Sequence, residues 1–204
     1  MARDLQPIVK QSRREGYALH PKAHKVLARK TGVPGAHPQA RGRGGLYLTQ
    51  LREKQKVRRT YGLLEKQFAN LMTKATKMEG QAGENLLKLL ERRLDNVVYR
   101  AGFATSRRAA RQLVTHGHFM LNGKRVDIPS ITVSPEDEIT VRPRSQKNTY
   151  FANLSDVVNN AVQKPLSWMT SDAKKMSIKI VALPKREEAE DDINEQLIVE
   201  FYSR

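Results

Sequence analysis

Three arginines that could bind phosphate lie within five residues of one another, at Arg107, Arg108 and Arg111. The segment that begins at Arg107 is predicted to be helical. At 100° per residue the three arginines share one side of that helix and face outward, while alanine, leucine and valine share the other side. No acidic residue lies between Arg100 and Lys124 to neutralise them. Because a guanidinium group presents a fork of N–H donors that matches phosphate, the pattern favours contact with a nucleic acid over the alternative, a solvated helix surface.

A second cationic helix is predicted earlier in the chain, over residues 46–59. Its basic side chains fall into two stripes at helical spacing, with Arg52, Lys56 and Arg59 in one and Lys54 and Arg58 in the other. A solvated helix face usually carries both signs of charge, yet Glu53 is the only acid of this segment. We therefore predict that this helix follows a phosphate backbone.

The elements that hold the central arginines are predicted from apolar spacing and turn residues. Apolar residues recur at helical spacing between 84 and 101, and Gly102 is expected to end that helix with a positive φ angle. Thr105 or Ser106 is expected to cap the next helix by accepting a hydrogen bond from a backbone N–H. Asn122-Gly123 predicts a type I′ turn between two short strands. The predicted strands are 119–121, 124–126, 139–141 and 177–181.

The pattern beyond residue 150 is less regular. A short helix is predicted over 152–162, and Trp168 is expected in the core or in an interface. Five carboxylates between 187 and 192 have no nearby histidine, so a solvated loop is favoured over a metal site. Residues 193–201 fit a helix packed on another element, and a strand remains the alternative.

The residue types give no sign of catalysis. The chain contains no cysteine, which excludes a disulfide and a thiolate zinc site. Among the five histidines only His116 and His118 are close, and their spacing beside a glycine would point the two rings apart. Either ring could stack on a base or contact phosphate. We expect no enzyme activity, no cofactor and no metal.

The formal net charge of +16 indicates an anionic polymer as partner. Residues 1–60 contain 15 basic and 3 acidic side chains and residues 92–150 contain 11 and 5, whereas residues 151–204 contain 7 and 9. No apolar run approaches the roughly 20 residues that cross a bilayer, so no membrane partner is expected. We expect the first third and the middle of the chain to face the polyanion, and the last quarter to face protein or solvent.

Short motifs along the chain resemble a known family. The central ones are similar to an RNA-binding motif shared by several RNA-modifying enzymes and a ribosomal protein: Arg93-Leu94-Asp95, Gly102-Phe103-Ala104-Thr105-Ser106-Arg107, Gly117-His118 and Leu121-Asn122-Gly123-Lys124. Two flanking segments, 50–62 and 192–203, narrow the resemblance to the bacterial-type small-subunit ribosomal protein S four family, in a variant without cysteine.

This resemblance implies an α+β fold. It implies a helical domain over 46–91 that is completed by about 181–204. It also implies a small α+β RNA-binding domain of the S four type, αL-like, over 92–180 with its core at 92–142 and a short, mostly antiparallel sheet. Residues 1–45 are implied to form an extended basic N-terminal arm. The arm is rich in turn formers, so we expect it to become ordered on RNA, with a disordered solubilising tail as the alternative.

The resemblance also implies a function. It is that of a structural constituent of the small ribosomal subunit, a primary binder of small-subunit ribosomal RNA that nucleates assembly of the 5′ domain and contributes to translational accuracy. The implied partners are that RNA, messenger RNA near the entry channel, and neighbouring small-subunit ribosomal proteins, S five among them. The implied location is the cytoplasmic ribosome, with an organelle ribosome as the alternative. A stand-alone RNA chaperone or modifying enzyme is the competing hypothesis from another class. The predicted RNA-binding residues are Arg13, Arg14, Arg41, Arg43, Arg52, Lys54, Lys56, Arg58, Arg59, Arg93, Arg107, Arg108, Arg111, His116, Lys124 and Arg125.

Overall fold

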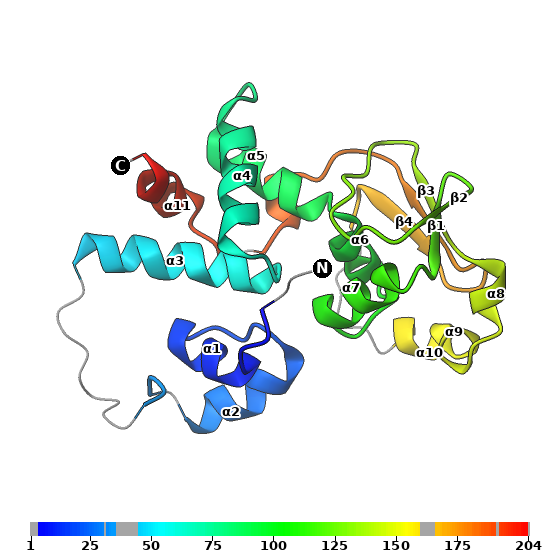
Figure 1. Cartoon of the computed structure of the whole chain (residues 1–204), viewed down its shortest axis with the longest axis horizontal. Helices are drawn as coiled ribbons and strands as arrows, with labels where there is room; N and C mark the ends of the chain where they lie inside the picture. Colours follow the sequence, from blue (N-terminus) through cyan, green and yellow to red (C-terminus); the bar gives the residue numbers. More distant parts are fainter. Residues whose placement is uncertain (1–3, 31, 36–44, 160–165, 191, 204) are drawn as a thin grey trace. The chain divides into compact units, whose positions relative to one another are not determined.

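The structure, a computed structural model, describes residues 4–30, 32–35, 45–159, 166–190 and 192–203. The chain divides into two compact units (Figure 1). We call Met1–Leu86 with Asp192–Arg204 the helical unit, and Leu87–Asp191 the sheet unit. Within the described ranges, no helix is long and apolar enough to cross a lipid bilayer.

The helical unit is arranged around its longest described helix, α3. In chain order its elements are α1 (Ile8–Glu15), the 3-10 turn η1 (Pro21–Ala23), α2 (His24–Arg29), α3 (Leu46–Thr60), α4 (Glu65–Thr76), the first half of α5 (Ala82–Glu91) and α11 (Glu195–Tyr202). Helices from both ends of the chain pack on α3, with α1 on one side and α11 on another (Figure 1). The predicted cationic helix over 46–59 is confirmed by α3.

The C-terminal segment, for which a strand had remained the alternative, is the helix α11. Asn194 caps it, because its side-chain oxygen accepts hydrogen bonds from two backbone N–H groups of the first turn. Phe201 then packs on α3: its ring centroid lies 5.7 Å from that of Tyr47 and 4.5 Å from the Nζ atom of Lys54. Packing of an apolar face on α3 thus selects the helix.

Part of the predicted N-terminal arm is helical and docks on α3. Gly16 ends α1 with a φ of 67°, and the guanidinium group of Arg13 donates to the carbonyl oxygen of Gly32 at 2.9 Å. The side chain of Glu15 has no exposed area and pairs with Arg52 and Arg59 of α3. These two partners lie 37 and 44 residues further along the chain, so the local composition gave no sign of the contact.

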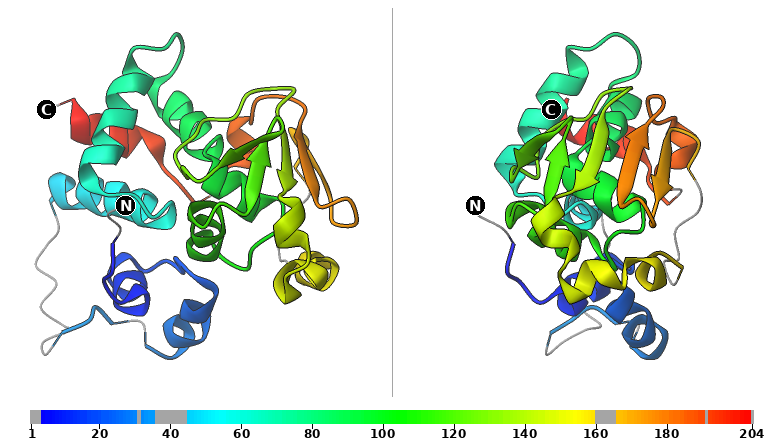
Figure 2. Two further views of the ribbon diagram at one scale, coloured as in Figure 1. Left: turned by 45° about the vertical axis from the view of Figure 1, so that its right-hand side comes forward. Right: turned by 90° about the vertical axis from the view of Figure 1, so that its right-hand side faces the viewer.

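The sheet unit contains one five-stranded antiparallel sheet with the strand order β2-β1-β3-β5-β4 (Figure 2). Its elements are the second half of α5, α6 (Leu94–Arg100), α7 (Arg107–Thr115), β1 (Phe119–Leu121), β2 (Lys124–Val126), β3 (Glu138–Val141), α8 (Pro143–Gln146), α9 (Thr149–Ala152), α10 (Leu154–Asn159), β4 (Met169–Asp172), β5 (Ser177–Ile180) and the 3-10 turn η2 (Arg186–Glu188). The four predicted strands are confirmed. The sequence did not predict β4, because Met-Thr-Ser-Asp lacks apolar alternation; this edge strand forms by pairing with β5.

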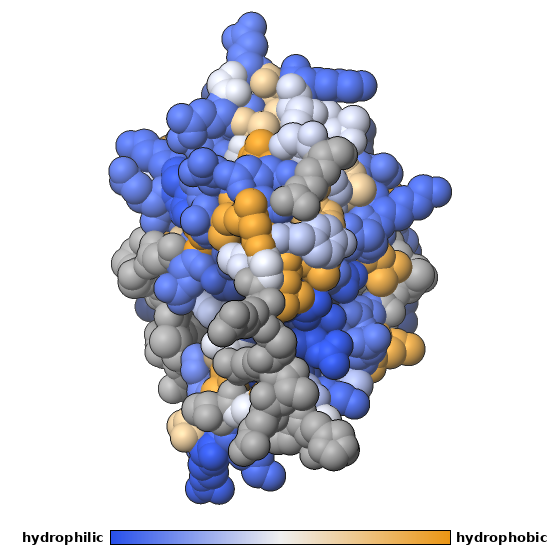
Figure 3. Space-filling model, turned by 90° about the vertical axis from the view of Figure 1, so that its left-hand side faces the viewer, coloured by the Kyte–Doolittle hydropathy of each residue, from blue (hydrophilic) through white to orange (hydrophobic). Residues whose placement is uncertain are grey.

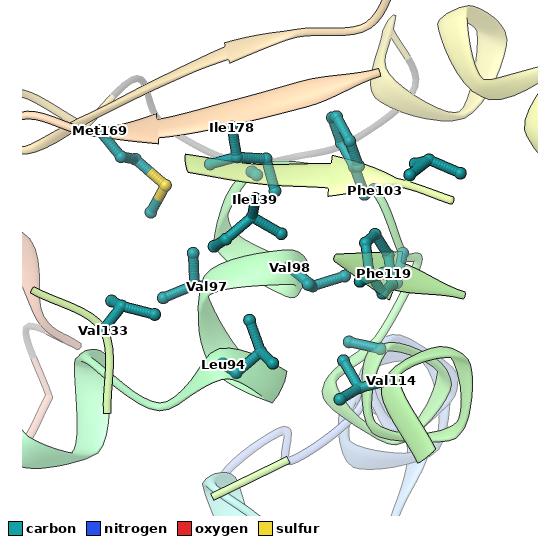
Figure 4. Close-up of a cluster of buried hydrophobic side chains, with 14 of the residues drawn as sticks. Leu94, Val97, Val98, Phe103, Val114, Phe119, Val133, Ile139, Met169 and Ile178 are labelled. Atoms are coloured by element: carbon teal, nitrogen blue, oxygen red, sulfur yellow. The ribbon is translucent and has the colours of Figure 1, made fainter. Parts of the chain in front are cut away.

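One cluster of apolar side chains joins the helices to the sheet. Leu94, Val97 and Val98 of α6 face Phe119 and Ile139 of the strands (Figure 4). Trp168, which we expected in the core or in an interface, is fully buried in the same cluster. Burial of these side chains holds α6, and through Val114 also α7, against the sheet.

The single helix predicted over 84–101 is wrong, because α5 ends at Glu91 and α6 begins at Leu94. Arg93 between them adopts an extended conformation, with φ −68° and ψ 137°, and forms a β-bridge with Thr132. The Nδ2 atom of Asn96 donates to the carbonyl oxygen of Glu91 at 3.1 Å, which satisfies a backbone group at the break. Since the apolar spacing continues across the break, the pattern concealed it.

The predicted turn residues are confirmed. Gly102 has a φ of 81°, and Asn122 and Gly123 have φ values of 49° and 78°, as a type I′ turn requires. Ser106 rather than Thr105 caps α7, because its Oγ atom accepts from the backbone N–H of Ala109 at 3.3 Å. These residues form the connections between α6 and α7 and between β1 and β2.

Candidate nucleic-acid interface

The three arginines of α7 do not all face outward, which corrects the prediction made from helical spacing. Arg108 is exposed, but the side chains of Arg107 and Arg111 are only 15% and 11% exposed. Arg107 lies with its guanidinium carbon 4.6 Å from the centre of the Tyr99 ring. The physical reason is that carboxylates from other parts of the sheet unit approach this side of α7.

Glu190 is one of these carboxylates. Its Oε1 atom lies 2.6 Å from the Nη2 atom of Arg107 and 3.5 Å from that of Arg100. The acidic run near the end of the chain was predicted to be a solvated loop, and this is wrong for Glu190. Glu188 remains partly exposed to solvent, and its carboxylate accepts hydrogen bonds from the backbone N–H groups of Ser167 and Lys185. In both cases the partner is distant in the sequence or is a backbone group, which composition does not reveal.

Two buried carboxylates complete the support of α6 and α7. Glu91 is 1% exposed at its side chain and accepts three hydrogen bonds, at 2.9 and 3.0 Å from Arg100 and at 2.8 Å from Asn96. Asp95 accepts two from Arg93, at 2.9 and 3.1 Å, and lies 3.8 Å from Arg111. Removal of one partner from such a buried pair leaves an uncompensated charge. These arginines therefore hold the sheet unit together.

The basic side chains of α3 are also paired inside the helical unit. Lys54 is 5% exposed and lies 2.6 Å from an oxygen of Glu65, which Arg58 approaches at 3.6 Å. Lys56 lies 3.3 Å from Glu53 and donates to the backbone carbonyl oxygen of Asp192. Side chains of α4 and α11, together with Glu53 of α3 itself, thus cover part of the predicted stripes.

Glu15, between Arg52 and Arg59, is in a less complete environment than Glu91. Burial raises the pKa of Glu15, and the attraction of the two arginines opposes this effect only in part. Its Oε2 atom and the Nε atoms of both arginines are buried with no hydrogen-bond partner among the described residues. This corner of the helical unit therefore retains hydrogen-bonding capacity on two guanidinium groups.

Exposed side chains that could contact a polyanion lie on β2 and at the end of α7 in the sheet unit. Lys124 and Arg125 on β2 are exposed, and so is His116 at the end of the helix. Gly117 makes room for the guanidinium group of Arg125, since a Cβ atom there would lie 2.8 Å from its Nε and Nη2 atoms. The ring centroids of His116 and His118 are 6.1 Å apart. Of the predicted contacts in this unit, these side chains and Arg108 are the ones that solvent reaches most freely.

Sequence reasoning missed three further cations that follow β3. Arg142 lies at the start of α8, Arg144 within it and Lys147 at its end, and the last two are exposed. The Nδ1 atom of His118 lies 3.0 Å from the Oγ atom of Ser145, so α8 contacts the segment that follows α7. Burial, together with the charges of His116 and Arg142, lowers the pKa of His118. The basic run Arg-Pro-Arg-Ser-Gln-Lys was the signal that could have identified this segment.

The remaining predicted residues are distributed differently. Arg14 is exposed on α1, whereas Arg93 is buried against Asp95. Arg41 and Arg43 lie outside the described residues.

The surface of the helical unit near the start of α3 is not uniformly polar, since apolar side chains appear among hydrophilic ones in Figure 3. The exposed apolar residues at this helix start are Leu46, Tyr47 and Leu48.

No group of three potential metal-binding side chains occurs in the part of the chain that the structure describes. The described residues include exposed cations on the surface of α7 and of the hairpin of β1 and β2, while internal arginine–carboxylate pairs hold α6 and α7. Such a surface on a small α+β unit is the electrostatic footprint of a nucleic-acid-binding protein.

Comparisons with known proteins define the class further. Residues 92–139 match the family model of the S4 domain, and residues 3–91 match that of the ribosomal protein S4/S9 N-terminal domain. The chain is 51% identical to the small ribosomal subunit protein uS4 of Chloroflexus aurantiacus, 50% identical to that of Roseiflexus castenholzii and 48% identical to that of Clostridioides difficile. Each alignment covers the whole of both proteins. The chain therefore belongs to the bacterial-type uS4 family of small ribosomal subunit proteins.

This membership confirms the resemblance to the S four family and the α+β fold that it implies. It also confirms that the chain is not an enzyme, because the family consists of structural ribosomal proteins. The stand-alone modifying enzyme is thereby excluded as a reading of the central motif.

Proposed function

We propose that this chain, a structural constituent of the small ribosomal subunit, is a primary binder of small-subunit ribosomal RNA and nucleates assembly of the 5′ domain. The observation that carries the proposal is that Arg108 on α7, Lys124 and Arg125 on β2, and His116 at the end of α7 are all exposed. Base edges lie in a deep, narrow major groove of A-form RNA, so cations fixed in space read the positions of phosphates rather than the sequence.

In this proposal the predicted basic residues divide into two roles. The exposed ones contact phosphates directly. The paired ones, such as Arg107 with Glu190 and Lys54 with Glu65, fix the helices that carry the contacts. A rigid arrangement of cations favours recognition of the shape of a folded RNA, because fewer side chains must be ordered when the complex forms. We add Arg144 and Lys147 to the contact set on the basis of their exposure.

The finer parts of the function rest on family membership. We propose that Arg41 and Arg43 lie near the path of messenger RNA, and that contact with a neighbouring small-subunit protein, S five, contributes to translational accuracy. The net negative charge of residues 151–204, which contain 7 basic and 9 acidic side chains, supports a protein rather than an RNA neighbour for part of that segment.

Chemical footprinting on small-subunit RNA with and without the protein tests the proposal. We expect protections that cluster where several helices of the 5′ domain converge, and that form before other subunit proteins are added. Protections that appear only after other proteins have bound would contradict the primary role. Sedimentation of a lysate provides the control, since recovery of the protein only as a free species, outside small subunits, would contradict the ribosomal assignment itself.

A further inference from the structure

The helical unit contains a pocket of about 310 Å³ between α1 and α3. It is lined by Gln6, Pro7, Lys10, Gln11, Arg14 and Arg59. Three of these six side chains are cations, and they come from two helices that meet only in the folded unit. Lys10, which the sequence patterns did not single out, is one of them.

The charges around the pocket are predominantly positive. Lys10 and Arg14 are exposed and lie one helical turn apart on α1. Asp4 is an acid near the pocket but does not line it, and its carboxylate accepts hydrogen bonds from the backbone N–H of Gln6 and the Nε2 atom of Gln11. Glu15, the other nearby acid, is buried against α3. The open side of the pocket is therefore cationic.

The guanidinium group of Arg59 has a donor that the carboxylate of Glu15 does not use. Glu15 binds the Nη1 atom of Arg59, while the Nε atom of Arg59 is buried with no partner among the residues that the structure describes. The nearby Nε atom of Arg52 is in the same state. An unsatisfied buried donor is costly, so an anion in the pocket that accepts a hydrogen bond from the Arg59 guanidinium group, which lines it, is favoured.

The start of α1 adds to this preference. Pro7, which lines the pocket, is the N-cap residue of α1, and the first turn contains no acidic residue and no side-chain cap. The free N–H groups and the helix dipole at such an end favour negative charge. Three independent features thus point to an anion: the cations that line the pocket, the unpartnered guanidinium donors and the uncapped helix start.

We propose that this pocket binds one phosphate group of an RNA strand, with Lys10 and Arg14 as its ligands and Arg59 behind them. The proposal rests on the proposed ribosomal RNA binding and adds a phosphate site in the helical unit. The lining contains no aromatic side chain on which a base could stack, so the site contacts the backbone and is independent of sequence. Glu15 in turn positions Arg59 from the protein side.

The test compares two double variants of the full-length chain with equal loss of charge. Lys10→Ala with Arg14→Ala removes the two ligands, whereas Lys22→Ala with Lys25→Ala removes two exposed lysines of η1 and α2 that do not line the pocket. Affinity for a 5′-domain RNA fragment is measured over a range of salt concentrations. We expect the pocket variant to lose about tenfold in affinity and about one unit of the log–log salt slope. The control should lose less than about twofold.

A second readout uses inorganic phosphate alone. In the parent protein, phosphate should shift the NMR signals of the Arg59 Nε–H group and of the first-turn amides of α1 in a saturable manner, and the pocket variant should lose this response. An unchanged RNA salt slope in the pocket variant would overturn the proposal. Phosphate shifts without any change in RNA binding would assign the pocket to free anions and would also overturn it. If the parent protein fails to bind the RNA fragment at all, the proposed function fails rather than the pocket alone.

Discussion

The helices α3 and α7 have similar sequence patterns, but their arginines are paired with carboxylates to different extents. On α7, Arg107 and Arg111 are bound to Glu190 and Asp95. On α3, Arg52 and Arg59 share the single carboxylate of Glu15, and both retain a buried Nε donor without a partner in the described part of the chain. Arginines at helical spacing can therefore be structural in one unit and only partly neutralised in the other.

The difference has a physical origin in how many carboxylates serve each pair of arginines: Arg107 and Arg111 have Glu190 and Asp95, whereas Arg52 and Arg59 share Glu15. Three acids of the sheet unit, Glu91, Asp95 and Glu190, serve four arginines, and hydrogen bonds from Asn96 and from the backbone add to their coordination. At α1 and α3 one buried acid serves two arginines. A guanidinium group whose donors are all used inside the protein has little left for phosphate, whereas one with unused donors does. Arginine content along a helix therefore does not show by itself which guanidinium groups have donors left for a phosphate.

The largest effect is expected from Glu91→Ala in the sheet unit. This change leaves Arg100 without its main carboxylate and removes one of the two acceptors of the Asn96 Nδ2 atom, and loss of one partner of a buried pair costs about 3–5 kcal/mol. The free energy of unfolding from urea titration measures the loss. Glu187→Ala, at an exposed acid, serves as the control and should remain within about 0.5 kcal/mol of the parent. A loss below about 1 kcal/mol for Glu91→Ala would contradict the structural role assigned to the buried arginine–carboxylate pairs of the sheet unit.

A smaller, opposite pair of effects is expected on α7 itself. Arg107→Ala loses its contacts with Glu190, Asn96 and Tyr99 and should destabilise the protein by about 1–2 kcal/mol. Arg108→Ala should leave stability within about 0.5 kcal/mol and lower the log–log salt slope of RNA binding by about 0.7–0.9. Unfolding curves and RNA titrations of both variants check this.

Gln112→Ala, an exposed and uncharged position on the same helix, controls for the effect of substitution as such. It should leave the log–log salt slope unchanged and keep the free energy of unfolding within about 0.5 kcal/mol of the parent. If Arg107→Ala altered only RNA binding and Arg108→Ala only stability, the two roles assigned on α7 would be reversed.

The smallest effect concerns the pH dependence of the helical unit. Burial raises the pKa of Glu15 above its ordinary value of 4.5, so the folded protein holds that proton more tightly and stability from this group falls as pH rises from 4.5 through the raised pKa. Burial acts in the same direction on Glu65, but hydrogen bonds from Lys54 and Tyr202 outweigh it and lower its pKa. Stability from Glu65 is therefore present above pH 4.5 and is lost as pH falls through the lowered pKa.

Unfolding free energies of Glu15→Gln and Glu65→Gln, measured against pH and compared with the parent, should differ from the parent with opposite slopes. Equal slopes would show that the two carboxylates of the helical unit are in equivalent environments, and the incomplete pairing of Glu15 would no longer distinguish α3.

Local features of the sheet unit were predictable because local chemistry decides them. The turn at Asn122-Gly123 requires positive φ angles that few other residues accept, and the cap of α7 needs a hydroxyl next to the first turn. The break at Arg93 was not predictable, since a β-bridge to Thr132 causes it and that partner lies in a distant loop. The edge strand β4 likewise exists because β5 offers it hydrogen bonds.

The candidate site was predictable in composition but not in detail. Arg108, Lys124 and Arg125 are exposed as expected, whereas helical spacing wrongly placed Arg107 and Arg111 on a solvent face. Spacing along one helix describes its own faces only. It contains no information about which other segments cover a face.

The sequence by itself determined the family, the net positive charge, four of the five described strands, the turns and the presence of two arginine-bearing helices, because each of these depends on residue types or on neighbours within a few positions. The tertiary structure alone decided which cations are neutralised. Carboxylates such as Glu15 and Glu190 reach their arginines only after folding, across 44 and 83 residues of chain. Coulomb interactions depend on distance in space and on burial rather than on separation in sequence.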